Sequence, residues 1–267
     1  MPETILANYH THTPRCHHAT GTEEEYIQTA QHCGYHVLGF SDHPPWKYAD
    51  PDFTSHIRMR PDELEGYVAT LKALQEKYAD KLHIHIGLEA EYFPAYLPWL
   101  REESDRLGIE YWEFGCHYDT TDENHGFYFG RPRNSTDVRR YAEQVQAGLE
   151  TGQYLYLAHP DLALNYHDQF GKEEETALRE ICAAAVKTNT PLEYNLLGLQ
   201  SHTRDDGTIG YTTDRFWEIA ADYPVKAILG CDAHDPAELD VVPLLREKQA
   251  WLRGLGIEVL DSIPGLV

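Results

Sequence analysis

A single α/β domain built from about seven βα units is predicted by two observations on the sequence. Short apolar, β-rich runs alternate along the chain with longer segments of helical period, which is the pattern of parallel strands joined by helices. The chain has 267 residues, of which 42% are hydrophobic, and this is enough to bury one sizeable core. We therefore expect residues 1–267 to form one α/β domain.

The first βα unit carries the clearest signals. Residues 5–9 form an apolar run typical of a buried strand, and residues 10–21 follow as a loop. Thr22 and Glu25 have the spacing of a capping box, and Gly34 has the place of a helix C-cap. These residues predict a strand, a loop and a helix that ends at Gly34.

The later units repeat this order. Further strands are expected at residues 37–40, 82–88, 111–116, 154–158, 192–194 and 225–229. Helices are expected at residues 61–78, 136–150, 173–187, 213–221 and 242–253. The stretch 119–133 has no regular period, and we interpret it as a loop near the functional site.

Charge and composition exclude several partners. The 44 acidic and 22 basic residues give a formal net charge of −22, which disfavours nucleic acid because its binding requires Lys and Arg on phosphates. A small phosphorylated substrate would need local positive charge, which bound metal ions supply. No apolar run is long enough to span a bilayer, so no membrane partner is expected. The sequence does not indicate an oligomeric state.

The expected compartment is the cytoplasm. The first residues lack the basic and apolar regions of a signal peptide. The five cysteines are odd in number and never in a C-x-x-C arrangement, which argues against a disulfide framework.

Potential metal ligands stand at the end of nearly every expected strand. They are His10 and His12, Asp42 and His43, Glu89, His117, His159 and Asp161, and Asp232 and His234. In a βα barrel the carboxyl ends of all strands meet on one face, where the loops build the active site. Residues two apart on extended backbone point the same way, so each H-x-H or D-x-H pair can share one metal cluster.

The ordered set of motifs resembles the polymerase and histidinol phosphatase (PHP) superfamily, and more narrowly its monofunctional histidinol phosphatases. The motifs are HTHTPRCHH from residue 10, SDH from 41, Glu89, GCH from 115, AHPD from 158 and DAH from 232. They span nearly the whole chain in family order. The resemblance implies a distorted seven-stranded (β/α) barrel and one PHP-type metal-dependent phosphoesterase domain over residues 1–267.

The resemblance also implies two to three divalent metal ions. The first would be held by His10, His12, Glu89 and Asp232. Glu89 would bridge to a second ion held by His117 and His159. A third would be held by His18, His43 and His234. We choose His18 over His17 because it lies six residues after the second histidine of the H-x-H pair, which is the usual family spacing.

A ligand set of imidazoles and carboxylates suits zinc, manganese or iron, and the sequence does not choose among them. Such ions would activate water for hydrolysis and neutralise phosphoryl oxygens. Asp42 and Asp161 stand beside expected ligands, and each could orient an imidazole from behind. Asp42 could equally cap the turn before Pro44.

Residues for the substrate are harder to assign. Gln200 stands where histidinol phosphatases often carry a phosphate-binding arginine. Arg204, Arg131 and Arg133 lie in expected loops and are candidates to replace it, although each alone is more often a surface residue. An aromatic-rich region could enclose an imidazole-bearing substrate or simply pack in the core.

Three functions remain in competition. The resemblance implies hydrolysis of L-histidinol phosphate to L-histidinol and phosphate in histidine biosynthesis. The same metal chemistry could act on another small phosphorylated metabolite, and Gln200 gives that alternative weight. A noncatalytic metal-binding protein would also be rich in histidine, but it would carry its ligands in tracts or closed shells rather than at strand ends.

Overall fold

A computed structural model describes residues 5–167, 170–200 and 211–266. The chain divides into two compact units. The first unit comprises Met1–Trp112, Cys231–Pro243 and Asp261–Val267, and the second comprises Glu113–Gly230 and Leu244–Leu260. The single domain expected over residues 1–267 stays a prediction.

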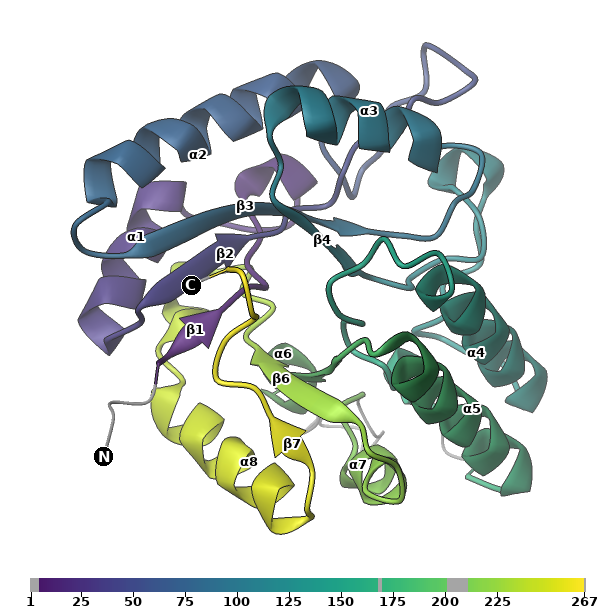
Figure 1. Ribbon diagram of the computed structural model, residues 1–267. Coiled ribbons are helices and arrows are strands. Elements are labelled where there is room, and N and C mark those ends of the chain that lie inside the picture. Colours follow the sequence, from purple (N-terminus) through teal and green to yellow (C-terminus); the bar gives the residue numbers. More distant parts are fainter. Residues whose placement is uncertain (1–4, 168–169, 201–210, 267) are drawn as a thin grey trace. The chain divides into compact units, whose positions relative to one another are not determined.

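The sheet of the first unit has one expected ligand, Glu89, within its strands. Its strands are β1 (Ala7–Asn8), β2 (Val37–Phe40), β3 (His83–Ala90) and β4 (Tyr111–Phe114), in the order β1-β2-β3-β4 (Figure 1). Strands β1 and β2, and β2 and β3, pair in parallel. The chain passes into the second unit within β4. All four residues of β2 are buried, as expected for a strand in the middle of a parallel sheet.

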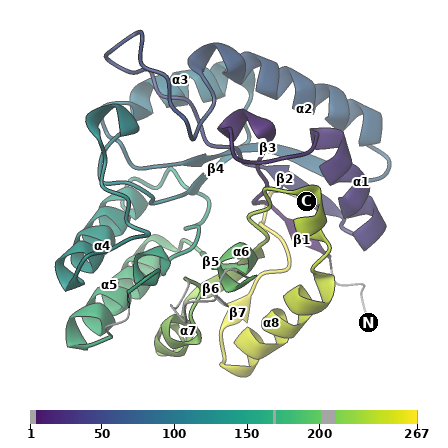
Figure 2. The ribbon, with the colours of Figure 1, turned by 180° about the vertical axis from the view of Figure 1, so that it is seen from behind.

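The helices of the first unit follow from local signals. They are α1 (Glu23–Cys33), α2 (Leu64–Tyr78) and α3 (Leu97–Leu107). The predicted capping box at Thr22 and Glu25 is present, and Gly34 ends α1 with a φ of 81°, so this prediction is confirmed. Figure 2 shows α1 and α2 beside the strands from behind.

Helix α3 is absent from the sequence-based prediction. It begins next to Pro98, in a stretch rich in aromatic residues and prolines that resembles a turn. Proline is tolerated in the first helical turn, where its missing N–H has no partner to lose. The buried Leu97, Leu100, Ser104 and Leu107 give this helix one apolar face.

The second unit has a three-stranded sheet of parallel strands. Its strands are β5 (Leu192–Asn195), β6 (Lys226–Gly230) and β7 (Glu258–Val259), in the order β5-β6-β7. The two-residue β7 was not predicted. The strand expected at residues 154–158 is reduced to Leu157, which forms isolated parallel bridges with Phe114 and Leu192. The prediction therefore gave the position but overstated the length of this strand.

The remaining helices agree with their predicted ranges within two residues, except for the unpredicted α6. They are α4 (Ser135–Leu149), α5 (Lys172–Thr188), α6 (Leu196–Gln200), α7 (Asp214–Ala220) and α8 (Val242–Gly254). Helices α4 and α5 lie side by side in both views (Figures 1 and 2). The alternation of parallel strands and helices confirms the predicted α/β class. In the part of the chain that is described, no helix is long and apolar enough to cross a membrane.

Acid should weaken the start of α5. Burial raises the pKa of the Glu174 carboxyl, but hydrogen bonds from Ser135, His167 and the backbone outweigh burial and hold this pKa at about 2. The Glu174 oxygens lie 3.0 Å from His167 Nε2 and 2.8 Å from the Gly171 N–H. Because the folded pKa is lower than the unfolded value, the stabilisation is present above about pH 4.5 and is lost as the pH falls toward 2.

Urea unfolding at about pH 6 and about pH 3.5 measures this effect. We expect Glu174→Gln to lose less unfolding free energy between the two pH values than the wild type. The exposed neighbour Glu173 provides the control, and Glu173→Gln should behave as the wild type. Equal losses in the wild type and Glu174→Gln would show that this carboxylate does not couple folding to pH.

Candidate metal centre

Hydrogen bonds hold together two separate segments of the first unit that carry candidate metal ligands. Thr11 and Ala233 form a parallel bridge, and the His12 N–H donates to the Ala233 carbonyl at 2.9 Å. The buried Asn8 amide donates to the His10 carbonyl at 3.0 Å and accepts from the Cys231 N–H at 2.8 Å. These bonds fix the H-x-H segment against the segment that carries Asp232 and His234.

The first group of ligands consists of two imidazoles and two carboxylates. One Asp232 oxygen lies 3.3 Å from His10 Nε2 and 3.2 Å from His12 Nε2. One Glu89 oxygen lies 3.6 Å and 3.5 Å from the same two nitrogens. All four side chains are at most 7% exposed. The structure therefore brings together the four residues that were predicted to hold the first ion.

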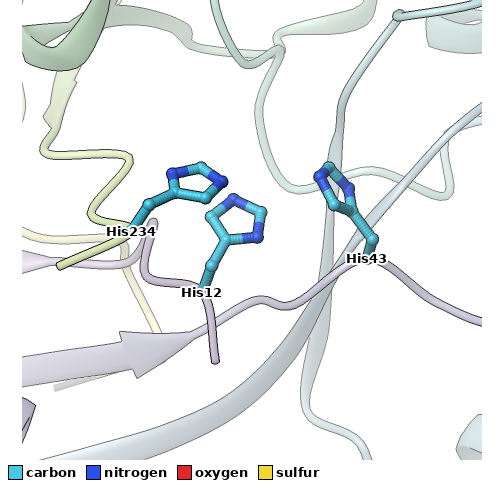
Figure 3. A group of neighbouring side chains, drawn as sticks. All are labelled: His12, His43 and His234. Atoms are coloured by element: carbon cyan, nitrogen blue, oxygen red, sulfur yellow. The ribbon is translucent and has the colours of Figure 1, made fainter. Parts of the chain in front are cut away.

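A second group of imidazoles lies next to the first. The His12 and His234 rings stack with centroids 4.0 Å apart, and the His18 ring lies 4.8 Å from His234 and 5.4 Å from His43. Figure 3 shows the His43 ring facing His12 and His234 from the chain after β2. Ring nitrogens of His12, His43 and His234 lie within 4.8 Å of one another. His18, the predicted choice over His17, is the histidine that lies beside these rings.

The second unit contains a pair of imidazoles of its own. Nε2 of His117, which follows β4, lies 3.1 Å from Nε2 of His159, which follows the Leu157 bridges. Two ring nitrogens on one tetrahedral zinc ion, each at about 2.0 to 2.1 Å, lie about 3.3 to 3.4 Å apart. The pair therefore fits one shared ion. The predicted bridge from Glu89 to this ion stays a prediction.

Two of the candidate ligands have unusual backbone conformations. His159 has a φ of 31° and Asp232 a φ of 52°, in the left-handed region that residues other than glycine rarely adopt. Such conformations cost about 1 to 3 kcal/mol and persist only where the surrounding structure fixes them. Their occurrence at two candidate ligands indicates that each unit stores backbone strain at one of these positions.

The charges of the first unit's ligands are strongly interdependent. Burial raises the pKa of the Asp232 carboxyl, but His10 and His12 outweigh it and hold this pKa below its ordinary value. Burial lowers the pKa of His12, but Asp232 and Asp42 raise it well above the usual 6.5. Burial and the neighbouring His12 lower the pKa of His234 to about 3. Such a set of carboxylates calls for a compensating cation, which a proton or a divalent metal ion can provide.

The fit to a metal is supported by His12. Both of its ring nitrogens are buried and make no hydrogen bond in the described structure, although carboxylate oxygens lie 3.2 to 3.5 Å away. Buried polar atoms normally have hydrogen-bond partners, and a ligand ion is one explanation when they do not. Nitrogen and carboxylate ligands together fit zinc, manganese or iron.

The two aspartates that were expected behind the ligands differ in their contacts. The Asp42 carboxylate accepts hydrogen bonds from the Thr13 N–H and hydroxyl, and it lies 3.5 Å from His12 Nδ1. Asp161 accepts from the Thr213 N–H at 2.6 Å, and burial raises the pKa of its carboxyl to about 6. Asp42 is thus placed to orient an imidazole, whereas the hydrogen bond from Thr213 ties Asp161 to the start of α7.

Cys16 is a candidate that sequence reasoning missed. Its sulfur lies within 4.8 Å of ligand atoms of His18 and His234, and also forms such a group with His12 and Asp42. Burial raises the pKa of this thiol, but the neighbouring His12 and His18 imidazoles outweigh burial and lower the pKa. The available signal was its place within the HTHTPRCHH run, four residues after His12.

Two of the predicted substrate arginines, Arg131 and Arg133, lie in the described part of the chain and have different contacts. Arg131 lies over the Tyr166 ring at 5.5 Å, and Arg133 pairs with Asp137 at 2.8 Å. Arg204 lies outside the described residues. The role of each in phosphate binding stays a prediction.

The PHP domain family model matches residues 8–197, more than half of the chain. The chain belongs to the PHP domain family. Its PHP match includes the H-x-H segment, Glu89 and the His117 and His159 pair, so the predicted family is confirmed.

Two curated proteins resemble this PHP chain. A protein of Deinococcus radiodurans named "Probable histidinol-phosphatase" is 28% identical over 246 residues, which cover 88% of this chain and 89% of the relative. A protein of Schizosaccharomyces pombe with the same name is 27% identical over 115 residues, which cover 41% of this chain and 38% of the relative.

A solved structure shares the PHP-type fold. The histidinol phosphate phosphatase of Lactococcus lactis subsp. lactis, crystallised with zinc, L-histidinol and phosphate, has a TM-score of 0.69 at 19% identity. The match covers 96% of this chain and 95% of that chain. This likeness confirms the predicted PHP-type α/β fold.

Proposed function

We propose that this protein is a metal-dependent phosphate monoester hydrolase that converts L-histidinol phosphate and water to L-histidinol and phosphate. The observation that carries the proposal is the buried set of two imidazoles and two carboxylates at His10, His12, Glu89 and Asp232. The curated relatives named histidinol-phosphatase support the choice of substrate. The reaction places the protein in histidine biosynthesis, and its five free cysteines fit the cytoplasm.

The proposed ligand assignment follows the predicted one and uses two to three divalent ions. Zinc is the first choice because the Lactococcus lactis protein was crystallised with it, and manganese and iron suit the same ligands. When bound, such ions activate water and stabilise negative charge on phosphoryl oxygens. This local positive charge offsets the repulsion of an anionic substrate by a chain with a formal net charge of −22.

The residues around the ions have distinct tasks. The Glu89 and Asp232 carboxylates supply the negative charge that holds cations among neutral imidazoles. Asp42 orients the His12 ring, because its carboxylate faces Nδ1 at 3.5 Å while Thr13 holds it from the other side. The Asn8 amide keeps His10 and the chain before Asp232 at a fixed separation. The protein thus contributes a set of carboxylates and imidazoles that are already held in position before the ions and the substrate bind.

Substrate preference tests the narrow form of the proposal. We expect kcat/KM for histidinol phosphate to exceed that for simple sugar phosphates by at least about tenfold, which corresponds to roughly 1.4 kcal/mol of transition-state preference. The measurement is a phosphate-release assay on purified, metal-replete enzyme. Good hydrolysis of several phosphoesters without this preference would support the proposed reaction type but contradict histidinol phosphate as the substrate. Metal binding without hydrolysis of any phosphoester would favour the noncatalytic metal-binding protein.

A further inference from the structure

We infer that Glu193 is a positioning residue that holds His159 in its ligand conformation through the backbone of His159. This inference rests on the proposed role of His117 and His159 as ligands of one ion. All of the residues that carry it belong to the second unit, and none of the metal assignments above includes Glu193.

The strained backbone of His159 is held on both sides by buried side chains. Its φ of 31° lies in the left-handed region, so this residue needs external support to keep its conformation. The His159 N–H donates to Glu193 Oε2 at 3.0 Å. The Tyr141 hydroxyl donates to the His159 carbonyl, also at 3.0 Å. Both supporting side chains are fully buried, and their bonds set the direction of the imidazole relative to His117.

Glu193 is itself held in place within β5. The Asn195 side-chain amide donates to Glu193 Oε2 at 3.0 Å, and Asn195 Oδ1 accepts from the Gly198 N–H at 2.8 Å. Glu193 and Asn195 are two residues apart on an extended strand, so both point to the same face. The carboxylate therefore accepts from His159 and Asn195 at a single oxygen, which leaves it little freedom to move.

A glycine on the neighbouring strand β6 leaves room for the Glu193 carboxylate. Asn195 pairs in register with Gly230 at the end of β6, and a Cβ atom on Gly230 would lie 1.8 Å from Glu193 Oε1. Gly230 does not have a positive φ, so the reason for glycine here is room rather than backbone conformation. The Glu193 carboxylate occupies the volume that any other side chain at position 230 would take.

Loss of the Glu193 carboxylate should weaken metal binding by His159. Residues behind a metal ligand typically change metal affinity about 10-fold to 100-fold when they are removed. Glu193→Leu keeps a side chain of similar size but leaves the His159 N–H without its acceptor. Glu193→Gln keeps an acceptor oxygen at nearly the same place. Comparison of the two variants therefore separates the effect of the hydrogen bond from the effect of side-chain volume.

The test is a zinc titration of metal-stripped protein, with free zinc set by a competing chelator. We expect Glu193→Leu to bind one zinc equivalent about 10-fold to 100-fold more weakly than the wild type, with the other equivalents unchanged. Glu193→Gln should restore the affinity to within about threefold of the wild type, because the acceptor is retained. Thermal unfolding of the metal-stripped variants reports any loss of stability independently.

Tyr194 provides the matched control. It is the next residue on β5, points to the opposite face and packs against Trp217 with ring centroids 5.4 Å apart. Tyr194→Leu should lower the unfolding temperature without weakening any zinc equivalent. Wild-type zinc affinity in Glu193→Leu would overturn the inference, as would loss of the same equivalent in Tyr194→Leu. If zinc affinity depends on Glu193 in this way but the wild type hydrolyses no phosphoester, the result would instead contradict the proposed function alone.

Discussion

Glu89→Gln should lower kcat/KM by more than about 100-fold and reduce the amount of bound metal. Residues behind a metal ligand already contribute about 10-fold to 100-fold, so a charged ligand should contribute more. One oxygen of this buried carboxylate lies 3.1 Å from His43 Nδ1 and within 3.6 Å of the His10 and His12 ring nitrogens. The substitution keeps the shape of the side chain and removes the charge that holds cations among these imidazoles.

The control for Glu89 lies on the same strand. His83 is an exposed residue of β3, and His83→Gln should leave both metal content and kcat/KM near the wild-type values. His85→Gln breaks the contact between His85 and Glu110, and any effect should fall on stability rather than on metal. Phosphate release and metal analysis of the three purified variants measure these outcomes. Equal and small losses in all three would contradict the assignment of Glu89 as a ligand.

The grouping of the candidate ligands in the first unit could be predicted because its signals are local. His10, His12 and Asp232 each follow an apolar run that ends in a loop, and parallel strands bring their carboxyl ends to one edge. The capping box at Thr22 and Glu25 sets the start of α1 through bonds between residues three apart. Both kinds of signal depend on residues that are close together in the sequence, so they can be recognised without the structure.

Residues that act through distant partners could not be foreseen. Glu193 supports His159 across 34 positions of the chain, and in the sequence it reads as one more acidic residue in a short strand. Cys16 becomes a candidate only when His234 and His18 are folded beside it. Helix α3 was missed because Pro98 and the nearby aromatic residues look like a turn, while its buried face shows in the packing. Such features depend on tertiary contacts.

Removal of the metal ions should abolish hydrolysis. The chain has a formal net charge of −22, and bound ions would supply both the activation of water and the stabilisation of phosphoryl charge. These effects are worth several kcal/mol of transition-state stabilisation, so kcat/KM should fall by at least about a thousandfold. We expect circular dichroism to show that the secondary structure is largely retained, because the core consists of buried apolar side chains rather than of the candidate metal ligands. Added zinc, manganese or iron should restore hydrolysis, each to its own level.

The most direct test of the account follows histidinol phosphate hydrolysis as metal is returned to the stripped wild-type protein. Bound metal is determined on the same samples. The account predicts that activity is absent in verified metal-free protein, rises with bound equivalents and levels off at two to three per chain. Full hydrolysis of histidinol phosphate by protein shown to contain no metal would contradict it.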